Sequence, residues 1–353
     1  MQIPIRNLYY LLLYAWDRMG EGQTVDISGV GHGQTLDLLA RILDVGTRRV
    51  LRRGLDRGYV EHTEPTARLR GRVAFGPSVR RMLLPQARAV CTFDELTPDV
   101  MTNRIVRTTV GRLTMTGGLD AGLRAGLRDV HRRMEGVSEV GLSRAAFGLM
   151  RLHGGNAAYR LLLSVCALVH ANLMPREDGQ GYRFLDPLRD EQQMDRLFEE
   201  FLRGFFRREC PGVRASAETL QWAARPLSRS GPGRMPQMLT DVTLRGPGGA
   251  CVVDAKYYAS PLSSWHEGGR FHGSNLYQIM AYLRAMGARG EHADGVLLYP
   301  VVEGGFDHTY EVDGHRVRLL TLDLRRPWPE IHHALVALAA WSRASADQEM
   351  VAA

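Results

Sequence analysis

The chain has 353 residues, of which 44% are apolar and 24% are charged, a composition typical of globular proteins rather than of disordered or fibrous ones. No apolar run reaches the roughly 18 residues of a membrane span, and the four dispersed cysteines lack the spacing of a disulfide framework or a zinc site. We therefore expect a cytoplasmic protein of two domains with no membrane segment, and the net charge of +7 favours a polyanionic partner such as nucleic acid.

The first half of the chain reads as helices interrupted by one β-rich segment. Apolar residues at three- and four-residue spacing predict helices over residues 7–20 and 34–54. Residues 60–95 carry three prolines, short alternating stretches and an arginine cluster, which predict strands and loops that project from a helical body. Helical periodicity returns over residues 96–113 and 120–136.

The second half alternates helices and strands after a glycine-containing junction at residues 141–155. The predicted helices cover residues 157–173, 191–210, 274–287 and 329–343, and the predicted strands cover residues 237–246, 250–259, 294–302 and 315–324. This order predicts an α/β fold in which helices flank a mixed central sheet. We expect a mostly helical N-terminal domain over residues 1–150 and this α/β domain over residues 151–353.

The chain contains a single lysine, Lys256, whereas the other 44 of its 45 basic side chains are arginines. A guanidinium is planar and always charged, while an ammonium is a compact charge whose pKa moves readily. In so biased a chain, we expect a position that needs only positive charge to hold arginine, although a leftover surface lysine is the plain alternative. Lys256 is therefore a candidate for chemistry.

Two aspartates are predicted to share a site with Lys256. Residues two apart on a strand face the same side, so Asp254 and Lys256 project together. Asp241 lies 13 positions before Asp254, on the preceding strand and across a tight turn, so it can face the same point. An Asp-x-Lys pair alone is more often an exposed ion pair, but the second aspartate makes the set more specific.

These side chains suit metal-assisted hydrolysis of a phosphodiester. Mg²⁺ prefers oxygen ligands and usually takes one or two carboxylates together with water and phosphate oxygens. The metal acidifies an attacking water, and an ammonium beside it can orient or help deprotonate that water and can neutralise developing charge. We expect Asp241 and Asp254 to bind Mg²⁺, with Mn²⁺ as a substitute, and Lys256 to act beside the ion.

Further candidates lie on two predicted helices. Gln278 and Tyr282 are four residues apart and share one helix face. Glu199 and Glu200 lie on the helix that precedes the strands, and either could turn inward as a third acid. We take Glu199 as the candidate third metal ligand. Gln278 and Tyr282 alone would be ordinary helix-surface residues, so their weight comes from the combination with the Asp-x-Lys strand.

The arrangement resembles the PD-(D/E)XK nuclease superfamily, with the Gln-x-x-x-Tyr helix of its RecB-like branch. Eight segments between residues 3 and 300 narrow the resemblance: IPIRNLYYLLLYAW, LRGRVAF, CTFDELTPDVMTNRI, RFLDPLRDEQQM, TDVTL, VVDAKYY, FHGSNLYQIMAYL and LLYP. Together they are similar to the McrC family, the nuclease subunits of McrBC-type modification-dependent restriction systems. The chain has Thr240 where the superfamily name has proline, a residue whose main role there is conformational.

That resemblance implies a reaction and a partner. The C-terminal domain would be restriction-endonuclease-like, with Asp241, Asp254 and Lys256 as catalytic residues and with Gln278 and Tyr282 on the supporting helix. The chain itself would bind no nucleotide, and it contains no Walker-type glycine loop. It would act with an McrB-like AAA+ GTPase hexamer, stimulate its GTP hydrolysis, and cleave modified double-stranded DNA.

The projecting segment over residues 60–95 is implied to reach into the partner's ring. Arg68, Arg70 and Arg72 are candidates to contact the ring, and a solvated basic loop is the alternative for these three. Two other functions stay open. One is a stand-alone RecB-like DNA repair nuclease, and the other is a non-catalytic adaptor that activates the motor. The base or sequence that is recognised would be set by the partner.

Overall fold

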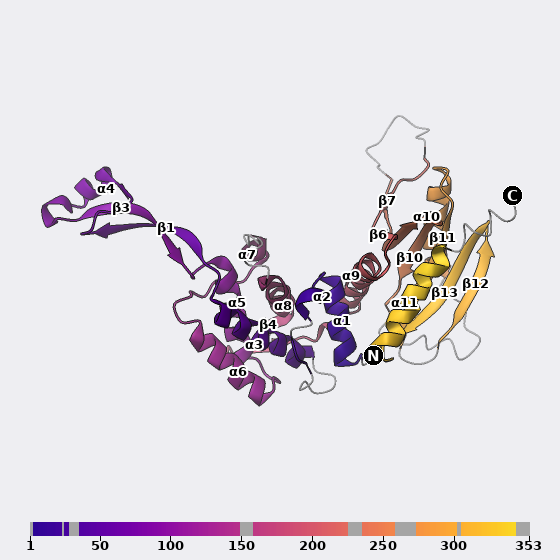
Figure 1. The fold of residues 1–353 in the computed structure, drawn as a ribbon, viewed down its shortest axis with the longest axis horizontal. Helices are drawn as coiled ribbons and strands as arrows, with labels where there is room; N and C mark the ends of the chain where they lie inside the picture. Colours follow the sequence, from indigo (N-terminus) through magenta and orange to yellow (C-terminus); the bar gives the residue numbers. More distant parts are fainter. Residues whose placement is uncertain are drawn as a thin grey trace. The chain divides into compact units, whose positions relative to one another are not determined.

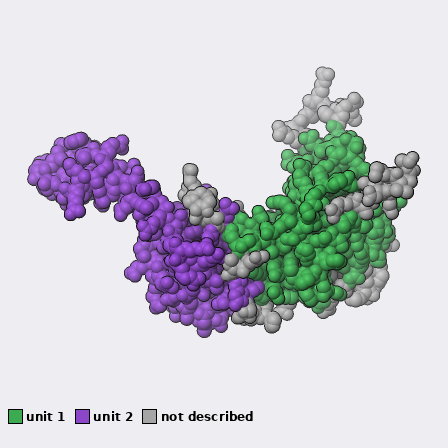
Figure 2. Space-filling view, viewed as in Figure 1, with its two compact units in different colours: residues 1–24, 28–35, 186–353 green, residues 25–27, 36–185 purple. Residues whose placement is uncertain are grey.

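A computed structural model describes residues 3–22, 25–27, 35–148, 158–224, 235–257, 273–301 and 305–343. The chain forms two compact units, and Figure 2 shows unit 1 (residues 1–24, 28–35 and 186–353) in green and unit 2 (residues 25–27 and 36–185) in purple. Among the described helices, none is long and apolar enough to cross a membrane. All four cysteines are free and buried.

The two units do not divide at residue 150. The first helix, α1 (Ile5–Ala15), belongs to the same unit as the C-terminal half because it packs against α9 (Glu191–Glu209). The Tyr14 hydroxyl donates a hydrogen bond to Glu209 Oε1 at 2.8 Å. Gly204 lets the two helices approach, since a Cβ there would overlap the Tyr14 carbonyl. This long-range packing moves the boundary to residue 185.

Unit 1 contains a six-stranded mixed sheet in the order β12–β13–β11–β10–β9–β6. Its strands are β6 (Arg214–Ser216), β9 (Val242–Gly246), β10 (Gly249–Ala255), β11 (Ala293–Val301), β12 (Asp307–Val312) and β13 (His315–Asp323). The pairs β10–β11 and β11–β13 are parallel, and the other neighbouring pairs are antiparallel. The predicted mixed α/β architecture is therefore present.

One predicted strand is broken. Residues 237–246 were expected to be continuous, but β8 (Met238–Leu239) pairs with β7 (Thr219–Leu220), whereas β9 pairs with β10. The backbone N–H of Thr240 donates to the carbonyl of Glu218, which turns the chain between the two pairings. Asp241 consequently lies in the break, immediately before β9.

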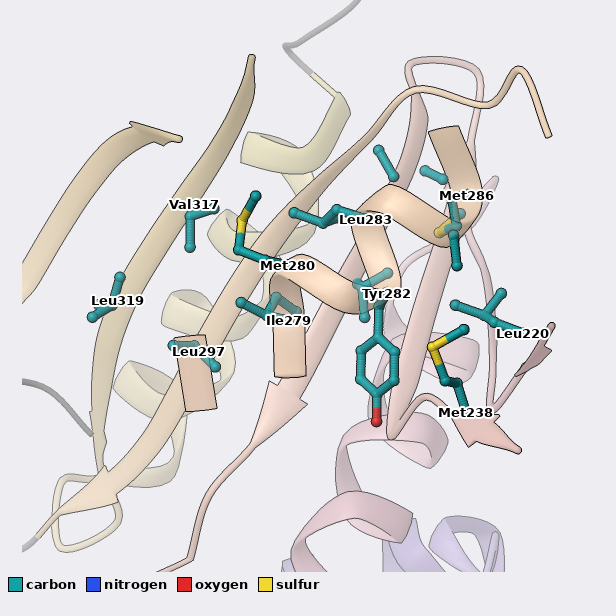
Figure 3. Packing of buried hydrophobic residues seen from close by; sticks show 14 of the residues in the cluster. Leu220, Met238, Ile279, Met280, Tyr282, Leu283, Met286, Leu297, Val317 and Leu319 are labelled. Atoms are coloured by element: carbon teal, nitrogen blue, oxygen red, sulfur yellow. The ribbon is translucent and has the colours of Figure 1, made fainter. Parts of the chain in front are cut away.

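Helix α10 (Gly273–Gly287) covers one face of the sheet and forms its main apolar core. Figure 3 shows Ile279 and Leu283 of this helix next to the strand that carries Leu297, in the same cluster as Val317 of the neighbouring strand. Gly295 of β11 permits the close approach, since a Cβ there would lie 2.8 Å from Ile279 Cγ1.

The other face of the sheet contacts α9 and α11 (Trp328–Arg343). Strand residues that alternate with those of the α10 core, such as Val253 and Val296, are fully buried. Apolar side chains on both faces explain why β10 and β11 read as continuous hydrophobic runs. Two short elements complete the described part of unit 1, α2 (Met19–Gly22) and the 3₁₀ turn η3 (Pro187–Arg189).

Unit 2 is built on a helical body. Its helices are α3 (Thr35–Arg53), α5 (Met101–Thr114), α6 (Ala121–Arg133), α7 (Arg144–Gly148) and α8 (Tyr159–Asn172), followed by the hairpin β4 (Leu173–Pro175)–β5 (Tyr182–Phe184). The helices predicted over residues 34–54, 96–113 and 120–136 are present with shifted ends.

The β-rich segment of unit 2 extends away from its helices (Figure 1), and we call residues 58–97 the finger. Its elements are β1 (Gly58–Thr66), β2 (Arg72–Val73), α4 (Phe75–Arg80), the 3₁₀ turn η1 (Leu84–Gln86) and β3 (Ala89–Thr97). Strands β1 and β3 pair antiparallel along their whole length. At the root, Asn103 Nδ2 donates to the carbonyls of Asp56 at 2.9 Å and Pro98 at 2.6 Å, which ties both ends of the finger to α5.

Candidate active site

Asp254 and Lys256 lie together at the end of β10. Asp254 is 0% exposed, and Lys256 is the first residue after the strand. Lys256 Nζ is 2.9 Å from Asp254 Oδ2. Alternation along β10 puts both residues on the α10 face, since Ala250 and Val252 belong to the α10 core.

Asp241 lies beside this pair because the β9–β10 ladder ends one residue earlier. The last pair of the ladder joins Val242 to Val253, so Asp241 follows opposite Asp254. Asp241 Oδ2 accepts a hydrogen bond from the backbone N–H of Ala255 at 2.9 Å. The structure therefore brings both predicted aspartates and the lysine to one point at the end of the β9–β10 hairpin.

Three polar residues on one face of α9 lie at the same end of the β9–β10 hairpin. Asp195, Glu199 and Arg203 follow at four-residue spacing and are all half-buried. Arg203 Nη1 donates to the Asp241 carbonyl at 2.7 Å and lies 3.4 Å from Glu199 Oε2. Asp195 Oδ1 accepts from the backbone N–H of Tyr257 at 3.1 Å.

Of the two candidate glutamates, Glu199 is the one that faces the aspartates, and Glu200 is exposed. Asp195 was not among the residues expected at the site from the sequence. The spacing of Asp195, Glu199 and Arg203 on a helix that carries apolar residues between them was the available signal.

Gln278 and Tyr282 act on the segment that leads to Asp241. Gln278 Nε2 donates to the Tyr282 hydroxyl at 2.8 Å, and this hydroxyl donates to the Leu239 carbonyl at 2.8 Å. Figure 3 shows the Tyr282 ring next to Met238, with its hydroxyl at the free end. Since Leu239 ends β8, the pair fixes the chain two residues before Asp241.

Asp254, Glu199 and Asp241 hold their protons more tightly than usual. Burial raises the pKa of Asp254, and the charge of Asp241 raises it further. Burial also raises the pKa of Glu199 to about 7, with added repulsion from Asp241 and Asp195. Burial raises the pKa of Asp241 as well, although the nearby charge of Lys256 opposes this.

Lys256 remains an ammonium at neutral pH. Burial alone would lower its pKa, but the contact with Asp254 and the charges of Asp241 and Asp195 together outweigh burial and raise the pKa above its ordinary value. This ion pair does not satisfy the aspartate. Although Nζ lies 2.9 Å from Oδ2, both Asp254 oxygens are buried without a hydrogen bond of good geometry.

The charges and oxygens of this site favour a bound divalent cation, but Glu199 does not join the two aspartates as a third ligand. Four acids (Asp195, Glu199, Asp241 and Asp254) interact with two cations (Lys256 and Arg203), which leaves a net charge of −2 when all are ionised. The oxygens of Asp254, which lack a hydrogen bond of good geometry, could accept a metal. Within the described residues, however, no three His, Cys, Asp or Glu side chains lie close enough to hold a metal ion. Glu199 thus does not form one three-carboxylate group with the two aspartates in this structure.

Comparison with known proteins places the chain in a family. The model of the McrBC 5-methylcytosine restriction system component family matches residues 6–300. The chain is also 33% identical over 335 residues to the type IV methyl-directed restriction enzyme EcoKMcrBC of Escherichia coli (strain K12), which covers 95% of this chain and 96% of that protein. The chain belongs to the McrBC family.

A solved structure shares the fold of this McrBC-family chain. The match is to a chain of the refined half-complex from the tetradecameric assembly of Thermococcus gammatolerans McrB AAA+ hexamers with bound McrC, with a TM-score of 0.58. The two chains are 16% identical, and the match covers 95% of this chain and 76% of that chain. At this identity the likeness shows a common fold alone.

A hollow of about 550 Å³ lies along α10 of this McrBC-family chain. Trp222, Tyr277, Arg284 and Asp313 line it together with apolar residues, and none of the acids of the cluster does. It therefore has no part in the chemistry considered for the aspartates and lysine.

Proposed function

We propose that this McrBC-family chain is a metal-dependent DNA endonuclease subunit, with a PD-(D/E)XK centre formed by Asp241, Asp254 and Lys256. The observation that carries the proposal is the state of Asp254. Its carboxylate is buried next to an ammonium and opposite a second carboxylate, and its oxygens have no hydrogen bond of good geometry. A buried acid left in this way costs stability, so a structural ion pair alone does not explain it.

The residues have separate tasks in this proposal. Asp241 and Asp254 would hold Mg²⁺, or Mn²⁺ in its place, and the bound ion would supply charge stabilisation and an acidified water. Lys256 stays protonated, so it donates hydrogen bonds to phosphate oxygens and stabilises the negative charge that develops on them. Glu199 adds negative charge beside Asp241, which strengthens the attraction for the cation.

Gln278 and Tyr282 support this centre through the segment that carries Asp241. Their hydrogen bonds to one another and to the Leu239 carbonyl hold the segment that carries Asp241. We propose the cytoplasm as the setting, where foreign DNA is met. In this proposal the chain itself binds no nucleotide, since the partner would bind the GTP.

The proposed partner is an McrB-like AAA+ GTPase hexamer whose GTP hydrolysis the chain stimulates while the complex cleaves methylated double-stranded DNA. The E. coli relative is a methyl-directed restriction enzyme, and the T. gammatolerans assembly contains McrB AAA+ hexamers with bound McrC. The finger supports this partner because its tip exposes large apolar side chains, an arrangement that marks interaction surfaces. These side chains are Leu69, Phe75, Val79, Met82 and Leu84.

The three arginines proposed as ring contacts differ in their surroundings. Arg70 Nη2 donates to Glu64 Oε1 at 2.9 Å, and its guanidinium lies 3.5 Å from the centre of the Phe93 ring. Arg70 therefore stabilises the finger itself. Arg68 and Arg72 are exposed and remain the better candidates for contact with the ring.

Cleavage of a methylated plasmid tests the proposed function. Purified chain, partner GTPase, GTP and Mg²⁺ should cut the plasmid, whereas Asp254→Ala and Lys256→Ala should abolish cutting and leave GTPase stimulation intact. Glu311→Gln, an exposed position on β12 of the same unit, serves as the control. Cutting that survives both active-site changes would support the adaptor alternative, and robust cutting without partner or nucleotide would support a stand-alone nuclease.

A further inference from the structure

The chain of strand β10 continues in the same direction beyond the point where its neighbour β9 ends. Their antiparallel ladder ends at the pair Val253–Val242, yet the chain continues through Lys256 to Tyr257. Alternate N–H groups of a strand point to the same edge, so the N–H groups of Ala255 and Tyr257 face the side on which β9 has ended. Buried backbone donors need partners.

Two side-chain carboxylates accept the hydrogen bonds that the backbone of a longer β9 would otherwise accept. Ala255 N–H donates to Asp241 Oδ2 at 2.9 Å, and Tyr257 N–H donates to Asp195 Oδ1 at 3.1 Å. Between them, Lys256 N–H donates to the Leu298 carbonyl of β11 at 3.0 Å. Three successive peptide groups are thus held by three different parts of unit 1.

We propose that Asp195 is a positioning residue of the nuclease centre. Its carboxylate accepts the Tyr257 N–H and so fixes the peptide that carries Lys256. This inference rests on the proposed function, because it assigns Asp195 a task in placing the ammonium of Lys256. Asp195 acts through the backbone and does not itself touch the reacting phosphate.

The geometry explains why this anchor matters. The lysine side chain is long and flexible, so the place of its ammonium depends on a fixed backbone and on the contact with Asp254. Helix α9 holds both strand ends from one face, since Arg203 binds the Asp241 carbonyl and Asp195 binds the Tyr257 N–H. Their eight-residue separation places them two turns apart on that face.

Two substitutions at one position separate the hydrogen bond from the charge. Asp195→Asn keeps an oxygen that accepts the Tyr257 N–H, whereas Asp195→Ala removes it. Amide hydrogen exchange of the peptide that ends at Tyr257 reports the bond directly, and kcat and KM for plasmid cleavage by the complete complex report its effect. Gln192→Ala, an exposed position on the same helix, is the control.

We expect Asp195→Ala to speed exchange of the Tyr257 amide about tenfold or more and to lower kcat by about tenfold to a hundredfold, with KM nearly unchanged. Asp195→Asn should stay within about threefold of the wild type in both measurements, since it keeps the acceptor.

Two results would overturn the inference. One is a Tyr257 amide that stays as protected in Asp195→Ala as in the wild type. The other is an Asp195→Asn variant that loses as much kcat as Asp195→Ala although the amide stays protected, because the charge would then be the essential feature. Amide exchange needs no nuclease activity, so a wild-type chain that fails to cut would contradict the proposed function, while exchange would still decide whether Asp195 holds the Tyr257 amide.

Discussion

Replacing Glu199 by glutamine is expected to stabilise the metal-free chain, and to do so more as the pH rises. Glu199 is half-buried beside Asp241 and Asp195, and burial with these charges raises its pKa from 4.5 to about 7. The folded chain therefore binds this proton more tightly than the unfolded chain. Below pH 4.5 the group is protonated in both states and costs nothing. Between pH 4.5 and 7 the wild type progressively loses stability.

The size of the effect follows from the shift. Each pKa unit corresponds to about 1.4 kcal/mol, so the ionised group would cost on the order of 3 kcal/mol at pH 8. Glutamine gives up the attraction between Glu199 and Arg203, whose closest atoms are 3.4 Å apart, and the side chain is 22% exposed to screening solvent. We therefore expect a net gain of about 1–2 kcal/mol, which raises Tm by about 2–8 °C in a domain of this size.

Thermal unfolding of the metal-free wild type and variant at pH 5 and pH 8 measures this difference. The Tm gain of Glu199→Gln should be small at pH 5 and full at pH 8, and Glu311→Gln should show no such trend. Added Mg²⁺ should narrow the gap at pH 8, because the cation supplies the positive charge that the cluster lacks. A gain independent of pH, or a variant less stable than the wild type at pH 8, would refute the electrostatic reasoning.

Tyr282→Phe removes the hydrogen bond to the Leu239 carbonyl, which is worth about 1 kcal/mol, and should slow DNA cleavage several-fold without changing GTPase stimulation. A loss of the same size in both assays would contradict this. Phe75→Ser at the finger tip should weaken binding of the GTPase partner about tenfold or more with an unchanged Tm, and equal affinity in a binding titration would count against the apolar contact. DNA affinity should fall on the order of 10³-fold between about 50 and 200 mM salt for about six phosphate contacts, and a flat response would exclude a phosphate-based interface.

Alternation along β10 and the register of the tight hairpin were enough to bring the two aspartates and the lysine together. Side-chain direction in a strand and the register of a tight hairpin are local properties, so Asp241, Asp254 and Lys256 could be assigned to one point from the sequence. The helix face shared by Gln278 and Tyr282 was local in the same sense.

The features that escaped the sequence analysis depend on contacts between distant segments. Asp241 lies in a strand break because β8 pairs with β7 rather than with β10. The Asp195 carboxylate meets the Tyr257 N–H 62 residues further along the chain. The division at residue 185 depends on α1 packing against α9, with Tyr14 bonded to Glu209. No local pattern specifies such partners.

The presence of a metal between the two aspartates is tested most directly by anomalous diffraction from crystals of the chain soaked in Mn²⁺. We expect one strong peak at about 2.1 Å from an oxygen of Asp241 and from an oxygen of Asp254, and its loss in Asp254→Ala. No peak at saturating Mn²⁺, or a peak away from both carboxylates, would contradict the proposed nuclease centre.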